Sequence, residues 1–465
     1  MSKPLGLQDA RRLFLDGTRA LAQVESNGMR IDVPYIHRML DLTQEKCDEI
    51  EAGLKSDPIW ATWKKVYGEG ANLGSGPQLA TVLFENMGIN SKSRTATGRH
   101  KTDAGALEEI DLPFVQNYLK LKKLSDARVK NLQGILAEVV DGFLRPHFSL
   151  NTTISYRSSS SSPNAQNFPV RDPMLAKLVR RAFIPRQGHA IVEIDLSGAE
   201  VRVSACYHKD PTMIDYIKRG HDYHKDLAKQ CYMLSEDQVT KGARGSAKGG
   251  FVFASFYGDW FVQIAANLWN TIGHDNLKTK DGVPLYEHLR SKGITELGEM
   301  GGEGKNRRPT PGSFMEHISE IYDDFWGVRF PVYSRWKEDW WSRYLEKGFC
   351  QGLTGFLYRG IYERNKIINY PIQGSSFHCL LWSLIHLQDW LNDNKMKSLI
   401  IGQIHDSIIL DVHLSELDDV LNKAYRILVQ EIREIWPWII VPLDAEAAVG
   451  YENWYSKQEV KLEAA

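Results

Sequence analysis

The chain has 465 residues, of which 43% are hydrophobic and 25% are charged, and its formal net charge is -1. This length exceeds a single compact core and predicts two or three subdomains with discontinuous boundaries. No apolar stretch is long enough to span a bilayer, which excludes a membrane protein. The near-zero net charge leaves nucleic-acid binding open, because a local basic face is enough to bind phosphates.

The N-terminal residues and the cysteines indicate the cellular compartment. The first 17 residues contain no apolar segment followed by a cleavage signal, so we expect no targeting peptide and a cytosolic protein. Five cysteines are too few and too dispersed for a disulfide framework or a zinc site, and we expect them to be reduced core residues. They are Cys47, Cys206, Cys231, Cys350 and Cys379.

The N-terminal third is predicted to be helical and carries no catalytic pattern. Helical periodicity is clearest at residues 35–54, 76–87 and 112–140. A basic loop at residues 91–101 suits either contact with a sugar-phosphate backbone or simple solvation. A serine run at residues 158–162 leads into a proline and has the composition of a linker. The basic residues of the loop are Lys92, Arg94, Arg99, His100 and Lys101.

Two aspartates far apart in the chain each lie beside apolar runs. Asp195 ends the run 191–194, and Asp406 lies in the middle of the run 398–412. These runs predict buried β-strands, the second of them a hairpin with His405 and Asp406 at its turn. A palm-like sheet that joins the strands could hold both carboxylates around two hard cations about 3.5 to 4 Å apart, as in phosphoryl transfer. For either aspartate alone, the simpler interpretation is that aspartate favours turns.

A long helical region separates the two aspartates. Residues 206–345 are mostly helical, and a basic interruption at residues 301–312 is interpreted as a flexible loop without a role. From residue 367 the pattern predicts a helix, the Asp406 hairpin, a second helix and a final strand at residues 439–441. One sheet is therefore expected to form from both flanks of a helical insertion.

Two cations lie four residues apart within this insertion. Arg244 and Lys248 share one face of a predicted helix and could clamp a triphosphate. Arginine suits bidentate contact with phosphate oxygens, and lysine can also give a proton to a leaving group. Phe253 and Tyr257 follow, and an aromatic ring beside a phosphate clamp can stack on a base. Surface helices carry such cation pairs routinely, and an aromatic stripe is often core, so this pattern alone is weak.

Six short motifs follow one another along the chain. They are Asn164-Ala-Gln-Asn-Phe-Pro169, Asp195-Leu-Ser-Gly-Ala-Glu200-Val-Arg202, the segment from Arg244 to Gly258, Asn369-Tyr-Pro-Ile-Gln373-Gly, Gln403-Ile-His405-Asp406-Ser407 and Val449-Gly-Tyr-Glu-Asn-Trp454. In this order they resemble the family A DNA polymerases, which include bacterial DNA polymerase I and its Klenow fragment. The resemblance covers nearly the whole chain, and six motifs in order are a strong signal.

The resemblance implies an α+β fold, a right-hand polymerase with a palm of antiparallel sheet and helices, helical fingers and a helical thumb. A thumb-like segment near the first residue leaves no room for the family's upstream proofreading exonuclease, so we expect no proofreading by this chain. The implied organisation is an N-terminal segment at 1–19, thumb at 20–140, first part of the palm at 141–205, fingers at 206–364 and second part of the palm at 365–465.

The resemblance also implies the catalytic and nucleotide-binding residues. Asp195 and Asp406 would hold two Mg²⁺ ions, and Lys248 would be a catalytic proton donor to the pyrophosphate leaving group. Glu200 would act with the Tyr257 hydroxyl as a gate that leaves no room for a ribose 2′-hydroxyl and so selects deoxynucleotides. The implied nucleotide-binding residues are Arg244, Lys248, His224, Glu200, Tyr257, Phe253 and Arg180.

Minor-groove hydrogen bonds are implied for another set. Arg157 stands six residues before Pro163, as the family spacing requires, and with Gln373 and Gln403 would contact acceptors that are nearly independent of sequence. Such contacts check base-pair geometry without reading the sequence. For Arg157 and Gln373 individually, a purely structural role agrees with the sequence about as well as a role in DNA binding. The implied DNA-binding residues are Arg157, Asn369, Gln373, Gln403 and His405.

Three positions depart from the family pattern. One residue more than expected separates Lys248 from Tyr257, and it would turn Tyr257 away by about 100° unless a single-turn π-bulge absorbs it. We predict such a bulge at residues 249–252; in a regular helix, Val252 and Phe256 would instead take the positions assigned to Phe253 and Tyr257. The other departures are Ser407 in place of a glutamate that is not an essential ligand, and Leu196 in place of a tyrosine, a packing change.

Two alternative functions remain from the sequence. A single-subunit RNA polymerase shares the His-Asp-Ser triplet, although Glu200 argues against it, and a non-catalytic accessory that binds primer-template junctions would not need the intact aspartates. The expected partners are primer-template DNA and deoxynucleoside triphosphates, with a separate exonuclease, helicase or processivity factor possible and no membrane. The expected setting is phage or bacterial replication or repair, in a bacterial cytosol or an infected host.

Overall fold

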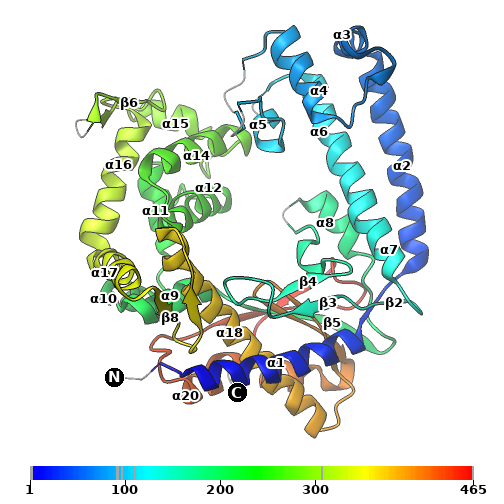
Figure 1. Ribbon diagram of the computed structural model, residues 1–465, viewed down its shortest axis with the longest axis vertical. Helices are drawn as coiled ribbons and strands as arrows, with labels where there is room; N and C mark the ends of the chain where they lie inside the picture. The colour runs from blue at the N-terminus through cyan, green and yellow to red at the C-terminus, as the bar shows by residue number, and fades with distance from the viewer. Residues whose placement is uncertain are drawn as a thin grey trace.

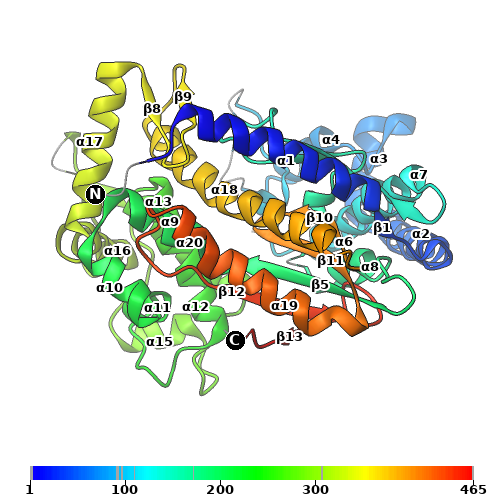
Figure 2. The ribbon, with the colours of Figure 1, turned by 90° about the horizontal axis from the view of Figure 1, so that it is seen from below.

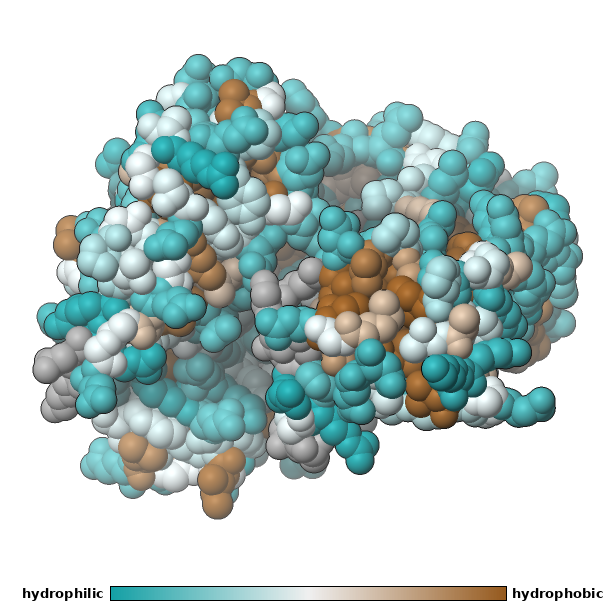
Figure 3. Space-filling model, turned by 90° about the horizontal axis from the view of Figure 1, so that it is seen from above, coloured by the Kyte–Doolittle hydropathy of each residue, from teal (hydrophilic) through white to brown (hydrophobic). Residues whose placement is uncertain are grey.

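The computed structural model describes residues 4–90, 94–95, 98–108, 110–170, 172–304 and 307–462. A sheet with its helices forms the base, and two mainly helical parts rise from it on opposite sides (Figure 1). We name the base, along which the dark blue helix α1 (Leu7–Asn27) lies, the palm. The green and yellow part that rises from the base is named the fingers, and the blue and cyan part that rises from it is named the thumb. Seen from above, the surface is hollowed between fingers and thumb (Figure 3).

The helices and short strands follow the predicted distribution along the chain. The N-terminal helix and the thumb comprise α1 Leu7–Asn27, β1 Met29–Arg30, α2 Val33–Ser56, α3 Pro58–Tyr67, η1 Gly68–Gly70, α4 Gly76–Ala80, η2 Thr81–Asn86, α5 Ala104–Glu108, α6 Pro113–Asp126, η3 Ala127–Gln133 and α7 Gly134–Glu138. The first palm part comprises β2 Phe143–Leu144, β3 His147–Ser149, β4 Ser159–Ser161, η4 Ala165–Asn167, α8 Pro173–Arg180, β5 His189–Leu196 and α9 Ala199–His208.

The remaining elements belong to the fingers and the second part of the palm. The fingers comprise α10 Pro211–Arg219, α11 Tyr223–Cys231, α12 Lys241–Ala247, η5 Lys248–Phe253, α13 Ala254–Tyr257, α14 Phe261–His274, α15 Leu285–Ser291, β6 Met300–Gly301, β7 Arg308–Pro309, α16 Phe314–Asp324, η7 Phe325–Arg329, α17 Pro331–Lys347, β8 Phe349–Gln351 and β9 Leu357–Arg359. The second palm part comprises α18 Arg364–Asp393, β10 Leu399–Ile404, β11 Ser407–His413, η8 Leu414–Glu416, α19 Leu417–Tyr425, η9 Arg426–Glu431, α20 Ile432–Ile435, β12 Ala445–Gly450 and β13 Gln458–Val460.

The palm sheet joins the two aspartate-bearing segments, as predicted. Its strand order is β10-β11-β5-β12-β13, and every adjacent pair is antiparallel. Asp195 on β5 lies opposite Ser407 on β11 and opposite Glu446 on β12. Strands buried on both faces are apolar without alternation, which explains why these runs could be recognised in the sequence.

Helices α1, α18 and α19 cover the underside of this sheet (Figure 2). Helix α18 continues through Pro371 although proline lacks an N–H and leaves the carbonyl four residues earlier without its helical donor. That carbonyl belongs to Ile367, and it accepts a hydrogen bond from Trp340 Nε1 at 3.1 Å. A side chain from the fingers thus satisfies the helix where the proline interrupts it.

Three local predictions differ from the structure. The serine run is strand β4, paired with β3, because backbone pairing with residues 147–149 overrides its linker-like composition. Residues 439–441 form no strand; Ile439 and Val441 are buried in the core, and the last palm strands are β12 and β13. The loop at 301–312 carries the short ladder β6–β7. Lys92 in the basic thumb loop and Lys305 in this loop lie outside the described residues.

The cysteine prediction is confirmed, because all five are buried and unpaired. Among the described residues, no helix is both long and apolar enough to cross a bilayer.

A buried histidine in α18 is expected to make folding sensitive to acid. His378 is fully buried; its ring contacts Thr354 Oγ1 at 2.7 Å and the Tyr156 carbonyl at 3.0 Å. Burial lowers the His378 pKa from 6.5 to about 3. Between these values the unfolded chain binds a proton that the folded chain does not, so this group lowers the free energy of unfolding by about 1.4 kcal/mol per pH unit as pH falls.

The measurement is urea unfolding from pH 6.5 to pH 4 for the unmodified protein and for His378→Gln. The variant should show a shallower dependence of unfolding free energy on pH, by about one proton's slope. His37→Gln on the exposed side of α2 is the control and should leave the slope unchanged. An identical slope in His378→Gln and the unmodified protein would contradict the prediction.

Candidate active site

The two predicted aspartates meet at one end of the palm sheet. Asp195 lies on β5, and Asp406 lies in the turn between β10 and β11. Ser407 Oγ donates a hydrogen bond to Asp195 Oδ2 at 2.8 Å. Burial raises the Asp195 pKa to about 6; the Ser407 hydrogen bond opposes the rise, and the nearby negative charge of Asp406 adds to it. A cation would relieve this accumulation of negative charge.

The donor set fits a hard divalent cation that also binds substrate oxygens. Within the described part of the chain, no three or more His, Cys, Asp or Glu side chains gather to hold a metal ion. Mg²⁺ is commonly held by one or two carboxylates while substrate phosphates and water complete its shell. The Asp195 and Asp406 carboxylates match that incomplete arrangement.

The Arg157 guanidinium lies between Asp406, a candidate metal ligand, and Glu200 of the predicted sugar gate. Arg157 Nη2 lies 3.7 Å from Asp406 Oδ1, and Arg157 Nη1 lies 3.7 Å from Glu200 Oε1. The Tyr257 hydroxyl donates a hydrogen bond to Glu200 Oε2. Burial raises the Glu200 pKa, and the hydrogen bond from Tyr257 opposes that rise. Arg157, Glu200, Tyr257 and Asp406 therefore form one connected cluster.

The fingers helix contains the predicted π-bulge. Residues Lys248–Phe253 are π-helical, between the α-helical segments α12 and α13. The wider turn absorbs the additional residue, so Lys248, Phe253 and Tyr257 stay together. Lys248 Nζ is 5.5 Å from the Phe253 ring centroid, and the Phe253 and Tyr257 rings are 6.3 Å apart. The regular-helix alternative, with Val252 and Phe256 in these places, is wrong because both are buried in the core.

A cationic cluster continues from this helix toward α11. His224 lies 6.0 Å from Phe253, ring centroid to ring centroid. Burial, followed by the positive charges of Lys248 and Arg244, lowers the His224 pKa to about 4. His224 Nδ1 is buried and has no hydrogen-bond partner among the described residues. An orphaned ring nitrogen between two cations is suited to an anionic ligand.

Comparison with known proteins identifies the family. The family model described as DNA polymerase family A matches residues 44–279 and 358–456. The chain belongs to DNA polymerase family A. It is 27% identical over 484 residues to the DNA polymerase of Bacillus phage SP01, covering 98% of this chain and 47% of that protein. It is also 27% identical over 435 residues to DNA polymerase I of Lactococcus lactis subsp. cremoris, covering 90% of this chain and 43% of that protein.

The fold also matches a solved polymerase domain. The POL domain of Pol1 from M. smegmatis, in complex with DNA primer-template and dNTP, superposes with a TM-score of 0.74 and 22% identity, over 95% of this chain and 70% of that one. This family A chain thus has the α+β right-hand fold of palm, fingers and thumb. The chain spans about half the length of the curated relatives it matches.

The contacts of Arg180 in the structure are with residues of the palm. Its guanidinium stacks 4.0 Å from the Trp454 ring centroid, and Nε donates to the Pro169 carbonyl at 3.0 Å. Arg180 Nη1 also lies 3.7 Å from Glu193 Oε2. Arg180 has 6% of its surface exposed and packs within the palm, and its assignment to nucleotide binding stays a prediction.

The predicted DNA-binding residues divide into two groups. Gln403 is fully buried, where Oε1 accepts from Ser158 Oγ and Nε2 donates to the His405 carbonyl, so it supports the hairpin from inside. Its assignment as a minor-groove donor stays a prediction. Asn369 and Gln373 line a small cavity together with Glu200, Phe253 and Tyr257, and Asn369 Nδ2 donates to the Tyr257 carbonyl at 3.2 Å. His405 is exposed at the hairpin turn.

Two residues of this site had no role in the sequence-based assignment. Ser407 orients Asp195, and Asp222 Oδ2 accepts from Arg244 Nε at 2.7 Å. The available signals were an aspartate just before a helical segment and a hydroxyl beside the hairpin aspartate. Neither signal shows which distant side chain the residue contacts.

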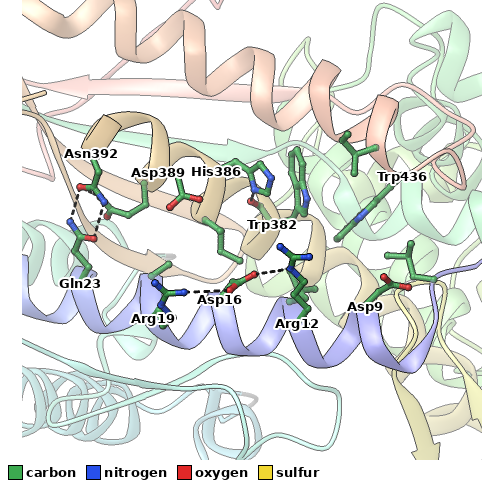
Figure 4. A pocket seen from close by; sticks show the side chains of 16 residues that line it. Asp9, Arg12, Asp16, Arg19, Gln23, Trp382, His386, Asp389, Asn392 and Trp436 are labelled. Atoms are coloured by element: carbon green, nitrogen blue, oxygen red, sulfur yellow. Dashed lines mark hydrogen bonds and ion pairs between the residues drawn. The ribbon is translucent and has the colours of Figure 1, made fainter. Parts of the chain in front are cut away.

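A larger groove lies elsewhere, on the underside of the palm between α1 and α18 (Figure 4). Its volume is about 800 Å³. Arg12 and Arg19 on α1 both pair with Asp16, and Trp382 stacks on His386 with ring centroids 3.8 Å apart. No predicted site residue lines this groove, so the chemistry and this cavity are separate.

Proposed function

We propose that this chain is a template-directed DNA polymerase that extends a primer 3′-hydroxyl with deoxynucleoside triphosphates and releases pyrophosphate. One observation carries the proposal: the Tyr257–Glu200 hydrogen bond, which Arg157 links to the Asp406 carboxylate of the palm. The Glu–Tyr pair closes the space that a ribose 2′-hydroxyl needs, next to carboxylates suited to nucleotidyl transfer. The primer-template and dNTP present in the M. smegmatis Pol1 complex support the same partners here.

Asp195 and Asp406 would hold two Mg²⁺ ions, with substrate oxygens and water completing their coordination. When bound, the ions would lower the pKa of the primer 3′-hydroxyl and neutralise charge on the triphosphate. Ser407 keeps the Asp195 carboxylate oriented by its hydrogen bond, and Arg157 stabilises the Asp406 charge before substrate arrives.

The fingers residues would bind the triphosphate and protonate its leaving group. Arg244 and Lys248 supply positive charge from one helix, and His224 supplies a ring nitrogen that has no protein partner. Lys248 carries the proton that pyrophosphate takes up on leaving. Phe253 offers a face for the incoming base, and Arg157 is close enough to the gate to contact the primer terminus.

The proposed domain organisation keeps the expected boundaries with one change. Helix α1 crosses the expected boundary between residues 19 and 20 and packs on α18 and β10. We therefore assign all of α1 to the palm and begin the thumb after residue 28. The proposed setting is phage or bacterial replication or repair in the cytosol, with a separate exonuclease, helicase or processivity factor as further partners.

The test is extension of a labelled primer on a DNA template with Mg²⁺, using deoxynucleotides or ribonucleotides. Efficient extension with deoxynucleotides alone is expected. Comparable use of ribonucleotides would favour an RNA polymerase, and tight junction binding without any extension would favour an accessory protein. A primer with a mismatched 3′ end, incubated without nucleotides, should not be shortened, since we propose no proofreading by this chain.

The π-bulge yields a further prediction about spacing. Deleting Gly249 should restore a regular α-helix, because the bulge absorbs one residue. Lys248 and Tyr257 should then still lie on the same side of the helix. A Cβ at Gly249 would meet no atom within 4 Å, so the position is open. Nucleotide incorporation by the deletion variant should stay within about tenfold of the unmodified chain.

The matched variant inserts one alanine after Gly249. This insertion turns the following residues by about 100° and should reduce incorporation more than about 100-fold. The measurement is the single-nucleotide incorporation rate for both variants. Equal damage from deletion and insertion would show that the bulge itself, and not the relative orientation of Lys248 and Tyr257, is required.

A further inference from the structure

The two triphosphate-binding elements of the fingers are joined by one carboxylate. Asp222 is the N-cap of α11, which carries His224, and its Oδ1 accepts from the Lys225 backbone N–H at 3.1 Å. Its other oxygen, Oδ2, accepts from Arg244 Nε at 2.7 Å, and Arg244 lies on α12. A single side chain thus fixes the start of one helix and a guanidinium on the next.

The hydrogen bond to Asp222 uses the Arg244 Nε–H and leaves the N–H groups of Nη1 and Nη2 available. Arginine has five N–H donors in a rigid plane, so a partner on Nε sets the direction of both terminal nitrogens. No hydrogen bond or ion pair joins Arg244 Nη1 or Nη2 to another residue in the described part of the chain. Four donors remain available for an anion, and the charges of both Arg244 and Lys248 act on the nearby His224 ring.

The electrostatic setting supports a lasting contact. Burial tends to raise the Asp222 pKa, but the Arg244 hydrogen bond and the Lys225 N–H outweigh it and the net pKa is lowered. Asp222 and Arg244 each have 39% of their side-chain surface exposed, so ligand can reach the pair. The carboxylate is negative and would by itself repel a triphosphate, so its presence requires a compensating role.

We propose that Asp222 is a positioning residue that holds the Arg244 guanidinium in the orientation that binds the incoming nucleotide's triphosphate. The inference rests on the proposed polymerase function and adds a determinant of nucleotide affinity to it. Asp222 touches no reacting atom and acts through Arg244.

The test is steady-state nucleotide incorporation by the full chain carrying Asp222→Asn. Asparagine keeps an oxygen for the helix cap but places no negative charge on Arg244 Nε. The KM for deoxynucleotide should rise about tenfold, as expected for loss of one charge-assisted hydrogen bond, while kcat changes less than about threefold. Asp222→Ser keeps an oxygen that can cap the helix, but the serine side chain is too short to reach Arg244. If the asparagine variant folds poorly, the serine variant should show the same raised KM with a nearly unchanged kcat.

Two further variants separate positioning from a general structural effect. Asp215→Asn removes the partner of Arg219 from an exposed ion pair on α10 and should leave KM unchanged. In an Arg244→Lys background, which has no Nε–H to hold, Asp222→Asn should have no additional effect on KM. An unchanged or lowered KM in Asp222→Asn would overturn the proposal. Absence of incorporation by the unmodified chain would instead overturn the polymerase function.

Discussion

Asp406→Ala is expected to reduce nucleotide incorporation by a factor on the order of 10³ or more. The substitution removes one of the two carboxylates that we propose to hold a pair of cations, and Asp195 alone would not hold both. It also leaves Arg157 without one of its two acidic partners. The measurement is the single-nucleotide incorporation rate at saturating deoxynucleotide with Mg²⁺.

The control for the loss of activity in Asp406→Ala is a substitution of another acidic residue in the same sheet. Glu446→Gln removes an exposed carboxylate opposite Asp195 on β12 and should change the rate by less than about tenfold. Primer-template affinity and the thermal unfolding midpoint of Asp406→Ala should match those of the unmodified protein. Substantial incorporation by Asp406→Ala would remove the carboxylate pair from the mechanism.

Glu200→Ala is expected to lower discrimination against ribonucleotides by about 100-fold. Truncation to alanine removes the carboxylate that accepts the hydrogen bond from the Tyr257 hydroxyl, and it opens space next to Tyr257. Deoxynucleotide incorporation should decline far less than in Asp406→Ala, because Asp195 and Asp406 remain. The measurement is the ratio of kcat/KM for a deoxynucleotide to that for the matching ribonucleotide.

Tyr257→Phe separates the hydrogen bond from the bulk of the two side chains. It keeps the ring against Phe253 but removes the hydroxyl that holds Glu200, so discrimination should fall to an intermediate value. An unchanged ratio in Glu200→Ala would exclude this residue as the sugar gate. In that case, the contact between Glu200 and Tyr257 would serve only to attach the fingers helix to the palm.

The fold could be predicted where apolar periodicity extends over a whole element. Strands β5 and β11 are buried runs, so their pairing and the convergence of Asp195 with Asp406 followed from the pattern. The serine strand β4 could not be predicted, because its backbone pairing with β3, and not its side chains, holds it. Residues 439–441 mimic a strand because burial in the core selects the same apolar residues.

In the candidate site, too, some residues could be placed from the sequence and others could not. The spacing between Lys248 and Tyr257, compared with the family pattern, was sufficient to predict the π-bulge, since one extra residue turns a regular helix by about 100°. Arg180 carries the charge of a phosphate ligand, yet its partners are Trp454 and Glu193. A cationic side chain near a site does not by itself indicate which acidic or aromatic group it will meet.

The sequence by itself therefore determined the chemistry that is available: two strand-borne aspartates, a helix with cations on one face and a bulge at a set position. These features depend on backbone periodicity and neighbouring residues. Only the tertiary structure decided that Arg180 meets Trp454 and Glu193, and that Asp222 meets Arg244. Such contacts depend on how whole helices pack against the palm, because apolar packing sets the relative positions of elements and polar side chains then pair with whatever is brought within reach.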